Sequence, residues 1–219
     1  LTSSAQAPIW IAAASRRIHG ALGVRPRSFR GPRMETSAET QPALVAEGYS
    51  ADFSVCPRRC DAFACRSYTS RWLLAPRVPY RPSWDSPFRR GELPLWVVPS
   101  SAFGAPFTSG LRYLLGQRIT TGLASFLGRE ARREKGALVY LFHSYEFTRR
   151  TAGRDERPLH QRLYPRDAEW RYQANRSLLT HVLALPQVEA LTASAYLRRL
   201  ENPARARLEA RRWPLRRAA

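Results

Sequence analysis

Short apolar runs alternate with longer segments of helical periodicity along this 219-residue chain, and this alternation constrains its fold more than any other feature. The periodic segments predict helices at residues 6–22, 110–133, 168–185 and 193–200. A further helix is predicted between a cap at Thr36 or Ser37 and a stop at Gly48. The apolar runs predict strands at residues 27–31, 49–55, 95–99 and 138–142. Helices that alternate with short strands are typical of an α/β domain with a parallel sheet, although four strands are few for a closed barrel.

The remaining segments are predicted to be connections and a tail. Residues 56–94 are dense in Pro, Arg, Trp and Tyr without a steady period, which indicates a long ordered loop. Residues 100–109 and 149–166 are predicted to be two further loops. Residues 205–219 contain six arginines and one acid, Glu209, and are predicted to fray. We therefore divide the chain into one domain, residues 1–200, and a basic tail, residues 201–219.

The segment 110–133 has the clearest helical pattern of the chain. Its apolar side chains recur at intervals of three and four residues, so we expect a single stripe that faces a core. The stripe consists of Leu111, Leu114, Leu115, Ile119, Leu123, Phe126 and Leu127.

The chain is strongly basic, with a net charge of +19 from 36 basic and 17 acidic residues. Such a surface attracts polyanions through counterion release. However, every basic residue except Lys135 is an arginine, and Ala and Pro are abundant, which indicates GC-rich codons rather than selection for charge. No glycine-aromatic RNA motif or zinc-finger spacing is present, so we expect no specific nucleic-acid partner. A noncatalytic basic protein that binds nucleic acid or another polyanion stays open as the alternative function.

Three further classes are disfavoured by the sequence. The cysteines, at positions 56, 60 and 65, have neither the even number of a disulfide framework nor a common zinc spacing, so we expect them to be small residues on and beside a loop. No run approaches the roughly 20 apolar residues of a membrane span. The apolar patch at residues 8–14 is followed rather than preceded by its charges, which is the wrong order for a secretory signal.

Two candidate site residues stand at the ends of predicted strands. The apolar run 138–142 closes on His143, and polar groups at the carboxyl ends of strands are where α/β enzymes tend to place their chemistry. The alternative is a histidine that is satisfied by local backbone groups. Arg30 lies at the end of the predicted strand 27–31, beside Phe29 and before Gly31 and Pro32. For Arg30 the alternative is a solvated surface charge.

Several segments of the chain resemble conserved blocks of the polysaccharide deacetylase family, of the carbohydrate esterase family four or chitooligosaccharide-deacetylase type. The segments occur in the same order along the chain as the blocks do in the family. Residues 22–55 resemble the family's third conserved block and read LGVRPRSFRGPRMETSAETQPALVAEGYSADFSV. Residues 137–147 resemble its last block and read ALVYLFHSYEF. The residues that match are Arg30, Pro32, Gly48 and Tyr49 in the former, and Leu141 and His143 in the latter. Weaker likenesses at 79–83 (PYRPS), 91–101 (GELPLWVVPSS) and 191–200 (LTASAYLRRL) extend the match from about residue 9 to residue 200.

The resemblance implies a deformed (β/α) barrel of the polysaccharide deacetylase type, here partial and without its first strands. It also implies a divalent metal, usually zinc, held by an Asp and two His, which activates water for attack on the amide or ester of an acetylated glycan. His143 has the position of the family's general acid, which protonates the departing amine or alkoxide. Arg30 has the position of the residue that orients the base. The backbone amide of Arg33 has the position that helps to stabilise the oxyanion.

Two blocks of the family are absent from these 219 residues. The sequence contains no Asp-Asp pair and no His-x3-His, and its histidines stand at positions 19, 143, 160 and 181. We therefore expect the metal ligands and the base to lie upstream of Leu1 in a longer protein. The chain alone is expected to bind no metal, to be inactive, and to be of low stability because its opening strands are missing. The prediction is thus a carboxyl-terminal portion of a metal-dependent polysaccharide deacetylase-like hydrolase.

Other polar and aromatic residues carry weaker predictions. The histidines at positions 19, 160 and 181 are expected at the surface rather than as ligands. The aromatic residues Trp72, Tyr80 and Trp84 either line a sugar-stacking groove or pack the loop that contains them. Glu146 and Asp167 have little support as a pair of acid-base carboxylates, since nothing in the sequence fixes their separation.

Overall fold

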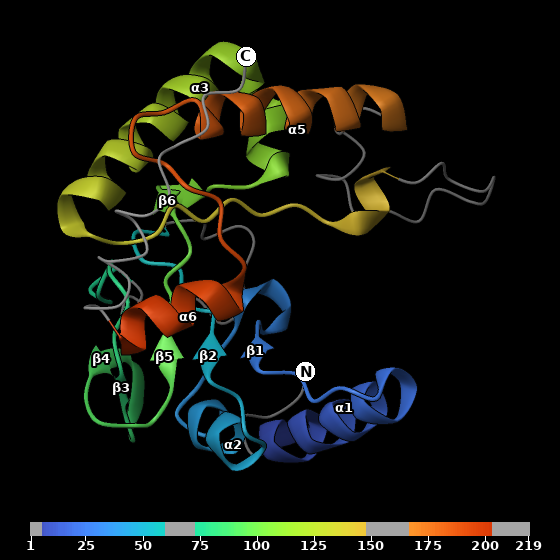
Figure 1. The fold of residues 1–219 in the computed structure, drawn as a ribbon, viewed down its shortest axis with the longest axis vertical. Coiled ribbons are helices and arrows are strands. Elements are labelled where there is room, and N and C mark those ends of the chain that lie inside the picture. The colour runs from blue at the N-terminus through green and yellow to red at the C-terminus, as the bar shows by residue number, and fades with distance from the viewer. Residues whose placement is uncertain (1–5, 60–72, 148–166, 203–219) are drawn as a thin grey trace.

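The computed structural model describes residues 6–59, 73–147 and 167–202 of the chain (Figure 1). Its helices are α1 (Ala7–Leu22), α2 (Thr40–Ala46), α3 (Ser109–Glu134), α5 (Ala168–Leu183) and α6 (Ala193–Glu201), with two 3-10 helices, η2 (Pro32–Met34) and η4 (Ser144–Phe147). Its strands are β1 (Ser28–Phe29), β2 (Ala51–Asp52), β3 (Pro82–Ser83), β4 (Ser86–Arg90), β5 (Trp96–Val97), β6 (Ala102–Phe103) and β7 (Ala105–Pro106). The predictions for Cys60, Cys65, Trp72, His160, the loop 149–166 and the tail from residue 203 lie outside the described residues.

A parallel three-stranded sheet in the order β1-β2-β5 forms the centre of the lower half of Figure 1. Ala51 in β2 pairs with Ser28 on one side and with Trp96 on the other. One helix precedes β1 and another precedes β2, as expected of an α/β domain. The three strands point toward the part of the molecule that contains α3, η4 and α5 (Figure 1). Residues that follow these strands therefore face that part of the molecule.

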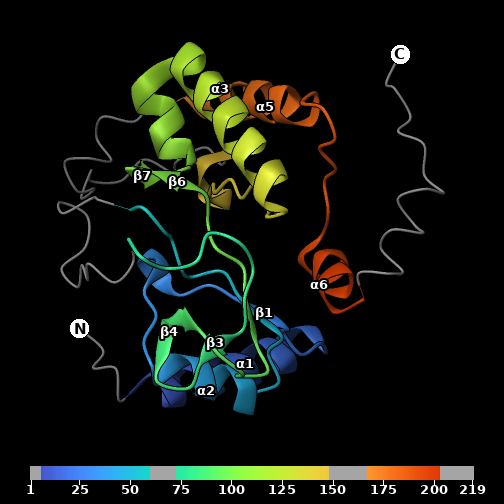
Figure 2. The same cartoon turned by 90° about the vertical axis from the view of Figure 1, so that its left-hand side faces the viewer.

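A first hydrophobic core lies where α1 and α2 pack near the amino ends of the strands (Figures 1 and 2). Its buried members are Ile11, Ala43, Leu44, Tyr49, Leu93 and Leu95. Ser15 and Tyr49 share a hydrogen bond between their hydroxyl groups at 3.0 Å, which ties α1 to the segment before β2. The far end of α1 leaves the core, because Ile18 and Leu22 are exposed.

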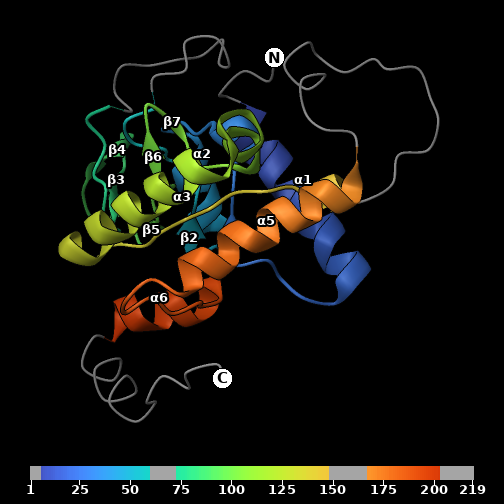
Figure 3. The same ribbon diagram turned by 90° about the horizontal axis from the view of Figure 1, so that it is seen from above.

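A second hydrophobic core lies between α3 and α5, which run side by side (Figure 3). Its buried members are Phe107, Ala124, Leu127 and Leu178. Both helices have a side-chain cap: Thr108 Oγ1 accepts from the Leu111 amide at 3.3 Å, and Asp167 Oδ1 accepts from the Glu169 amide at 2.9 Å. The helix α3 is interrupted at Gly116, whose φ of 75° lies in the left-handed region. These two helices carry the scaffold around His143.

Most predicted elements are present in the structure. The helices α1, α3, α5 and α6 match their predicted ranges closely, and β1, β2 and β5 lie inside the predicted apolar runs. The helix predicted before Gly48 is shorter than expected, because α2 begins only at Thr40. Ser37 Oγ accepts from the Thr40 amide at 3.3 Å, so Ser37 contacts the start of this helix. The parallel arrangement of β1, β2 and β5 agrees with the predicted α/β class.

The strand predicted at residues 138–142 is wrong. The segment is extended, but it makes one parallel bridge, between Leu141 and Thr108. Leu141 donates its amide to Phe107 O at 3.1 Å and accepts from the Ser109 amide at 2.8 Å. No ladder follows because the partner segment turns into α3 directly after Thr108. The candidate His143 therefore follows an extended segment that borders a helix start rather than a sheet strand.

Two connections predicted to lack strands contain antiparallel hairpins. The segment 56–94, predicted as a loop, contains the β3–β4 hairpin, and the connection 100–109 contains β6–β7. The first was missed because Pro82 and Pro87 are poor strand residues. The second turns at Gly104, whose φ is 73°, a value that glycine adopts without strain.

The apolar stripe predicted along α3 does not all face a core. Leu114, Leu115, Ile119 and Phe126 are exposed, whereas Leu127 is buried. The interruption at Gly116 changes the direction of the helix, and α5 covers only the face that carries Ala124 and Leu127. The prediction failed because periodicity alone does not reveal such an interruption.

Within the described residues the strands form three small sheets and close no barrel. None of the helices in those parts of the chain has the length and hydrophobicity that crossing a membrane requires.

Candidate functional site

The turn after β1 holds Arg30, and it is fastened to the end of β2. The Gly31 amide donates to Ser54 Oγ at 2.8 Å, and Ser54 Oγ in turn donates to the Asp52 carboxylate. Gly31 is buried, and a Cβ at this position would lie 2.0 Å from the backbone oxygen of Glu35. Only glycine fits there, so the turn that carries Arg30 depends on it.

Asp52 is the buried acid of this region and has no exposed surface. Its carboxylate also accepts from the Ser54 amide at 2.9 Å, from Gln41 Nε2 at 2.5 Å and from Thr36 Oγ1 at 3.4 Å. Burial raises the pKa of Asp52 to about 6, although the hydrogen bonds from Ser54, Gln41 and Thr36 lower it. The neighbouring Gln41 Oε1 is buried and accepts no hydrogen bond from the described residues.

Arg30 has an exposed side chain and lies within electrostatic reach of two buried groups, Asp52 and Cys56. Desolvation of its inner part lowers the pKa of the Arg30 guanidinium, while the attraction of Asp52 and of Cys56 acts in the opposite direction. Arginine stays protonated throughout the physiological range, so Arg30 places a permanent positive charge beside the end of the sheet.

Arg33 lies in η2 with φ at 55°, and Met34 follows with φ at 60°. Two left-handed residues in succession give a tight turn, in which the Met34 amide donates to Gly31 O at 3.0 Å. Arg59 Nη1 donates to Arg33 O at 2.9 Å and holds the turn from outside. No described residue accepts a hydrogen bond from the Arg33 N–H. We name Arg30, Gly31, Arg33, Asp52 and Ser54 the strand-end cluster.

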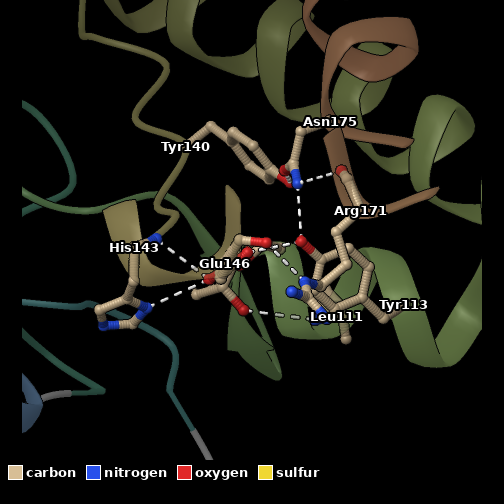
Figure 4. A network of polar contacts seen from close by, with 9 residues as sticks. Leu111, Tyr113, Tyr140, His143, Glu146, Arg171 and Asn175 are labelled. Carbon is tan, nitrogen blue, oxygen red and sulfur yellow. Dashed lines mark hydrogen bonds and ion pairs between the residues drawn. The ribbon is translucent and has the colours of Figure 1, made fainter. Parts of the chain in front are cut away.

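His143 lies at the start of η4 and contacts a buried carboxylate (Figure 4). Its Nδ1 is 3.2 Å from Glu146 Oε1, and its backbone amide donates to the same oxygen at 3.0 Å. The side chain of His143 is 67% exposed, whereas that of Glu146 is 7% exposed. The imidazole ring is thus mostly exposed, and its Nδ1 contacts a buried carboxylate.

Glu146 is held by residues of α3 and α5. Ser109 Oγ donates to its Oε1 at 2.7 Å, and the Tyr113 hydroxyl donates to its Oε2 at 2.5 Å. Arg171 Nε donates to its backbone oxygen at 2.5 Å. Burial raises the pKa of Glu146, but the hydrogen bonds from His143, Tyr113 and Ser109 outweigh it and leave the pKa below its ordinary value. We name His143, Glu146, Ser109, Tyr113 and Arg171 the histidine cluster.

A second layer of hydrogen bonds surrounds Tyr113. Asn175 Nδ2 donates to the Tyr113 hydroxyl at 2.7 Å, and the Tyr140 hydroxyl donates to Asn175 Oδ1 (Figure 4). Burial raises the pKa of both Tyr113 and Tyr140, so both are neutral donors. This layer links the segment before His143 to α3 and α5.

The structure places the predicted site residues in two groups. Arg30 and Arg33 belong to the strand-end cluster, at the end of the sheet that points toward η4, and His143 belongs to the histidine cluster (Figure 1). Two functional candidates were missed by the sequence reasoning. Asp52 was detectable from the pattern Asp-x-Ser after an apolar run, because such an acid commonly accepts from the backbone two residues on. Glu146 was considered only with Asp167, which instead caps α5.

The other polar and aromatic residues for which the sequence makes predictions have mainly structural positions. His181 is half-buried, and its Nε2 lies 2.9 Å from Ser125 Oγ, so it joins α5 to α3 rather than lying free at the surface. His19 is exposed in the last turn of α1. Tyr80 is buried and donates its hydroxyl to Pro87 O, whereas Trp84 is 61% exposed. The packing role therefore holds for Tyr80.

The donor groups that the structure describes do not fit a metal site. Among residues 6–59, 73–147 and 167–202, no three His, Cys, Asp or Glu side chains are arranged to hold a metal ion. The carboxylate of each cluster is instead occupied by protein hydrogen-bond donors. We therefore derive no step through a metal that is held by these residues.

One cavity, of about 40 Å³, lies elsewhere, beside the carboxyl-terminal half of α3. Arg58 and Arg77 line it together with Glu130 and Glu134, and none of Arg30, Arg33 or His143 does. Arg58 Nη1 pairs with Glu130 Oε1 at 2.9 Å, so the charges at this cavity are matched. The space is enough for a few water molecules.

Comparison of the chain with models of known protein families, with curated proteins and with solved structures finds no match.

Proposed function

We propose that residues 9–200 form part of a metal-dependent hydrolase of the polysaccharide deacetylase type, which acts on acetylated glycans by amide or ester hydrolysis. The architecture in this proposal is a deformed (β/α) barrel of which β1, β2 and β5 are consecutive strands and the first strands are missing. The observation that supports it most is the exposed His143 on a buried carboxylate, in the part of the molecule toward which the parallel strands point.

Three groups have roles in this proposal. His143 donates a proton to the departing amine or alkoxide, as an exposed imidazole whose Nδ1 contacts a carboxylate is able to do. The exposed Arg30 guanidinium orients the base by a charge-assisted hydrogen bond. The N–H of Arg33, to which no described residue provides an acceptor, donates to the developing oxyanion.

A complete site needs groups that these 219 residues do not contain. The family's Asp-Asp and His-x3-His are absent from the sequence. The metal, usually zinc, would lower the pKa of a bound water when those ligands are supplied. The proposal therefore expects no turnover from the chain alone.

A hybrid enzyme tests this proposal. The chain is joined behind an opening segment that carries an Asp-Asp strand end and a His-x3-His, and acetate release from N-acetylated chitooligosaccharide is measured. We expect release by the hybrid and a fall of about 100-fold or more in His143→Gln. Arg16→Gln, which removes an exposed arginine of α1, serves as the control and should leave the rate unchanged. A folded hybrid that releases no acetate contradicts the proposal.

A second candidate function is noncatalytic binding of a polyanion, and the net charge of +19 favours it. Its test is a salt titration with duplex nucleic acid and with an anionic polysaccharide. Strong binding that weakens steeply as salt rises supports this function, because phosphate or carboxylate contacts release counterions. Indifference to both polymers excludes it.

A further inference from the structure

The ionisation state of the Glu146 carboxylate determines which ring nitrogen of His143 carries a proton. Glu146 receives hydrogen bonds from Ser109, Tyr113 and the His143 amide, and its pKa lies below the ordinary value, so it is ionised at neutral pH. An ionised carboxylate accepts hydrogen bonds and donates none. The ring nitrogen that faces it, Nδ1 at 3.2 Å, must therefore carry a proton for the contact to be favourable.

The orientation of the ring follows from the same contact. One oxygen, Oε1, receives both the backbone amide and Nδ1 of His143, so the carboxylate fixes the backbone and the ring together. Nε2 lies on the side of the ring away from Glu146 (Figure 4). The side chain of His143 is 67% exposed, so these two contacts with Glu146 restrict a ring that is mostly in solvent.

We infer that Glu146 is the positioning residue of His143: it holds the imidazole in the Nδ1–H tautomer, in which Nε2 is the nitrogen without a proton. The catalytic meaning of this inference rests on the proposed function. In that reaction the ring takes a second proton at Nε2 from solvent water. This proton passes to the departing nitrogen or oxygen as the bond of that atom to the acyl carbon breaks and the electron pair stays on the departing atom. The ring then returns to the neutral Nδ1–H form.

The support of Glu146 is too extensive for an incidental surface pair. Its side chain is only 7% exposed, and its two carboxylate oxygens accept from Ser109 and Tyr113 of α3. Its backbone oxygen accepts from Arg171 of α5 at 2.5 Å. Among the described residues, the titratable and charged groups that face it from the packed segments are Tyr113, Arg171 and Tyr140. Tyr113 and Arg171 donate hydrogen bonds to it, whereas Tyr140 acts on it through space. An oriented carboxylate behind a histidine is a common way to select a tautomer.

The test is nitrogen NMR of the whole chain, with His143 assigned by the loss of its signals in His143→Gln. At a pH where the ring is neutral, the chemical shifts of Nδ1 and Nε2 report the tautomer directly. We expect the Nδ1–H form to dominate in the unmodified protein. Dominance of the Nε2–H form there overturns the inference, and this measurement needs no variant that has to fold.

Variants then show whether Glu146 is the cause. Glu146→Leu removes the acceptor and should lower the ratio of Nδ1–H to Nε2–H by about 2- to 10-fold. This range corresponds to the loss of one hydrogen bond of about 0.5–1.5 kcal/mol. Glu146→Gln keeps an oxygen of equal reach and should restore part of the ratio. Glu169→Leu removes an exposed carboxylate of α5 and should change nothing. An unchanged ratio in a folded Glu146→Leu protein contradicts the inference.

The outcomes separate this inference from the proposed function. The tautomer is measured without substrate, so an Nδ1–H form in a chain whose hybrid releases no acetate supports the positioning role and contradicts the hydrolase. Acetate release that depends on His143 together with an Nε2–H form supports the hydrolase and contradicts the positioning role.

Discussion

Gln41 donates its Nε2 to the buried Asp52 carboxylate at 2.5 Å, while its own Oε1 accepts nothing from the described residues. The pair thus combines a buried negative charge with a buried oxygen that lacks a donor. Both features are unfavourable, since each group has left water without full compensation. Their retention at the end of β2, beside Arg30, indicates that this region is not optimised for stability.

Replacing Asp52 by Asn should remove a pH dependence of stability. The folded-state pKa of about 6 exceeds the ordinary value of about 3.9, so the folded protein binds this proton more tightly than the unfolded chain. The contribution of Asp52 to stability therefore falls as pH rises from about 4 to about 6 and is constant above that. Asp52→Asn should flatten this slope and raise the free energy of unfolding at pH 7.5 by at most about 3 kcal/mol.

The physical reason for this gain includes Gln41, whose amide can rotate to accept a hydrogen bond from the new amide group. Urea unfolding between pH 4 and pH 8 measures the effect. Asp85→Asn is the control, because Asp85 is exposed and the pKa of its carboxyl is lowered mainly by Ser83. If the free energy of unfolding fell more steeply with rising pH in Asp52→Asn than in the unmodified protein, the buried charge would be stabilising, and the prediction would be wrong.

Gly31→Ala should destabilise the chain strongly. The added Cβ would lie 2.0 Å from Glu35 O, so the turn that carries Arg30 has to move. We expect a loss of about 2–3 kcal/mol or a failure to fold. Gly20→Ala is the matched control, because a Cβ there meets nothing within 4 Å and alanine favours the helix α1 by up to about 1 kcal/mol. Equal stability of the two variants would exclude the described turn.

Gly116→Ala should weaken the support of the histidine cluster. Gly116 has φ at 75° inside α3, a conformation that costs an alanine about 1–3 kcal/mol. Relief of that strain by straightening the helix would move Tyr113 away from Glu146. Gly122→Ala, in the regular part of the same helix with open space around it, should instead stabilise by up to about 1 kcal/mol. Denaturant titration of both variants checks the sign of each effect.

The exposed apolar side chains of α3 should cause association of the isolated chain. Leu115 and Ile119 are 41% and 59% exposed. Phe126 of the same helix is also exposed and lies edge-on to Phe103 at a centroid distance of 5.4 Å. Replacing Leu115 and Ile119 by Gln should reduce aggregation measured by light scattering, with little change in melting temperature.

Leu178→Ala is the control for those exposed positions, because Leu178 is fully buried and its loss should cost about 2–5 kcal/mol.

We also expect the chain alone to be of low stability. A monomer that melts cooperatively at high temperature would contradict this expectation.

Local patterns in the sequence were sufficient for the helices and for the positions of the sheet strands. The apolar periodicity of α1, α5 and α6 predicted their bounds closely, because each helix buries one face. The pattern failed for residues 138–142, since an extended segment beside a helix start has the same composition as a buried strand. It failed again at α3, where Gly116 interrupts the helix without interrupting its apolar spacing.

The candidate site was predictable only in part. His143 was selected from its place after an apolar run, and Arg30 from the turn residues beside it. The network behind His143 could not be predicted, because Ser109, Tyr113 and Arg171 come from two helices that are separate in the sequence. Contacts of this kind depend on how α3 packs against α5, which no local pattern encodes.

The central claim is that Arg30 and His143 serve the same substrate, and an NMR titration with N-acetylated chitooligosaccharide tests it most directly. The Nε–H signal of Arg30 and the ring signals of His143 are followed in the whole chain, with His19 of α1 as an internal reference. We expect both Arg30 and His143 to shift with one common dissociation constant while His19 stays unchanged. A saturable response at one of the two residues alone, or at neither, would contradict it.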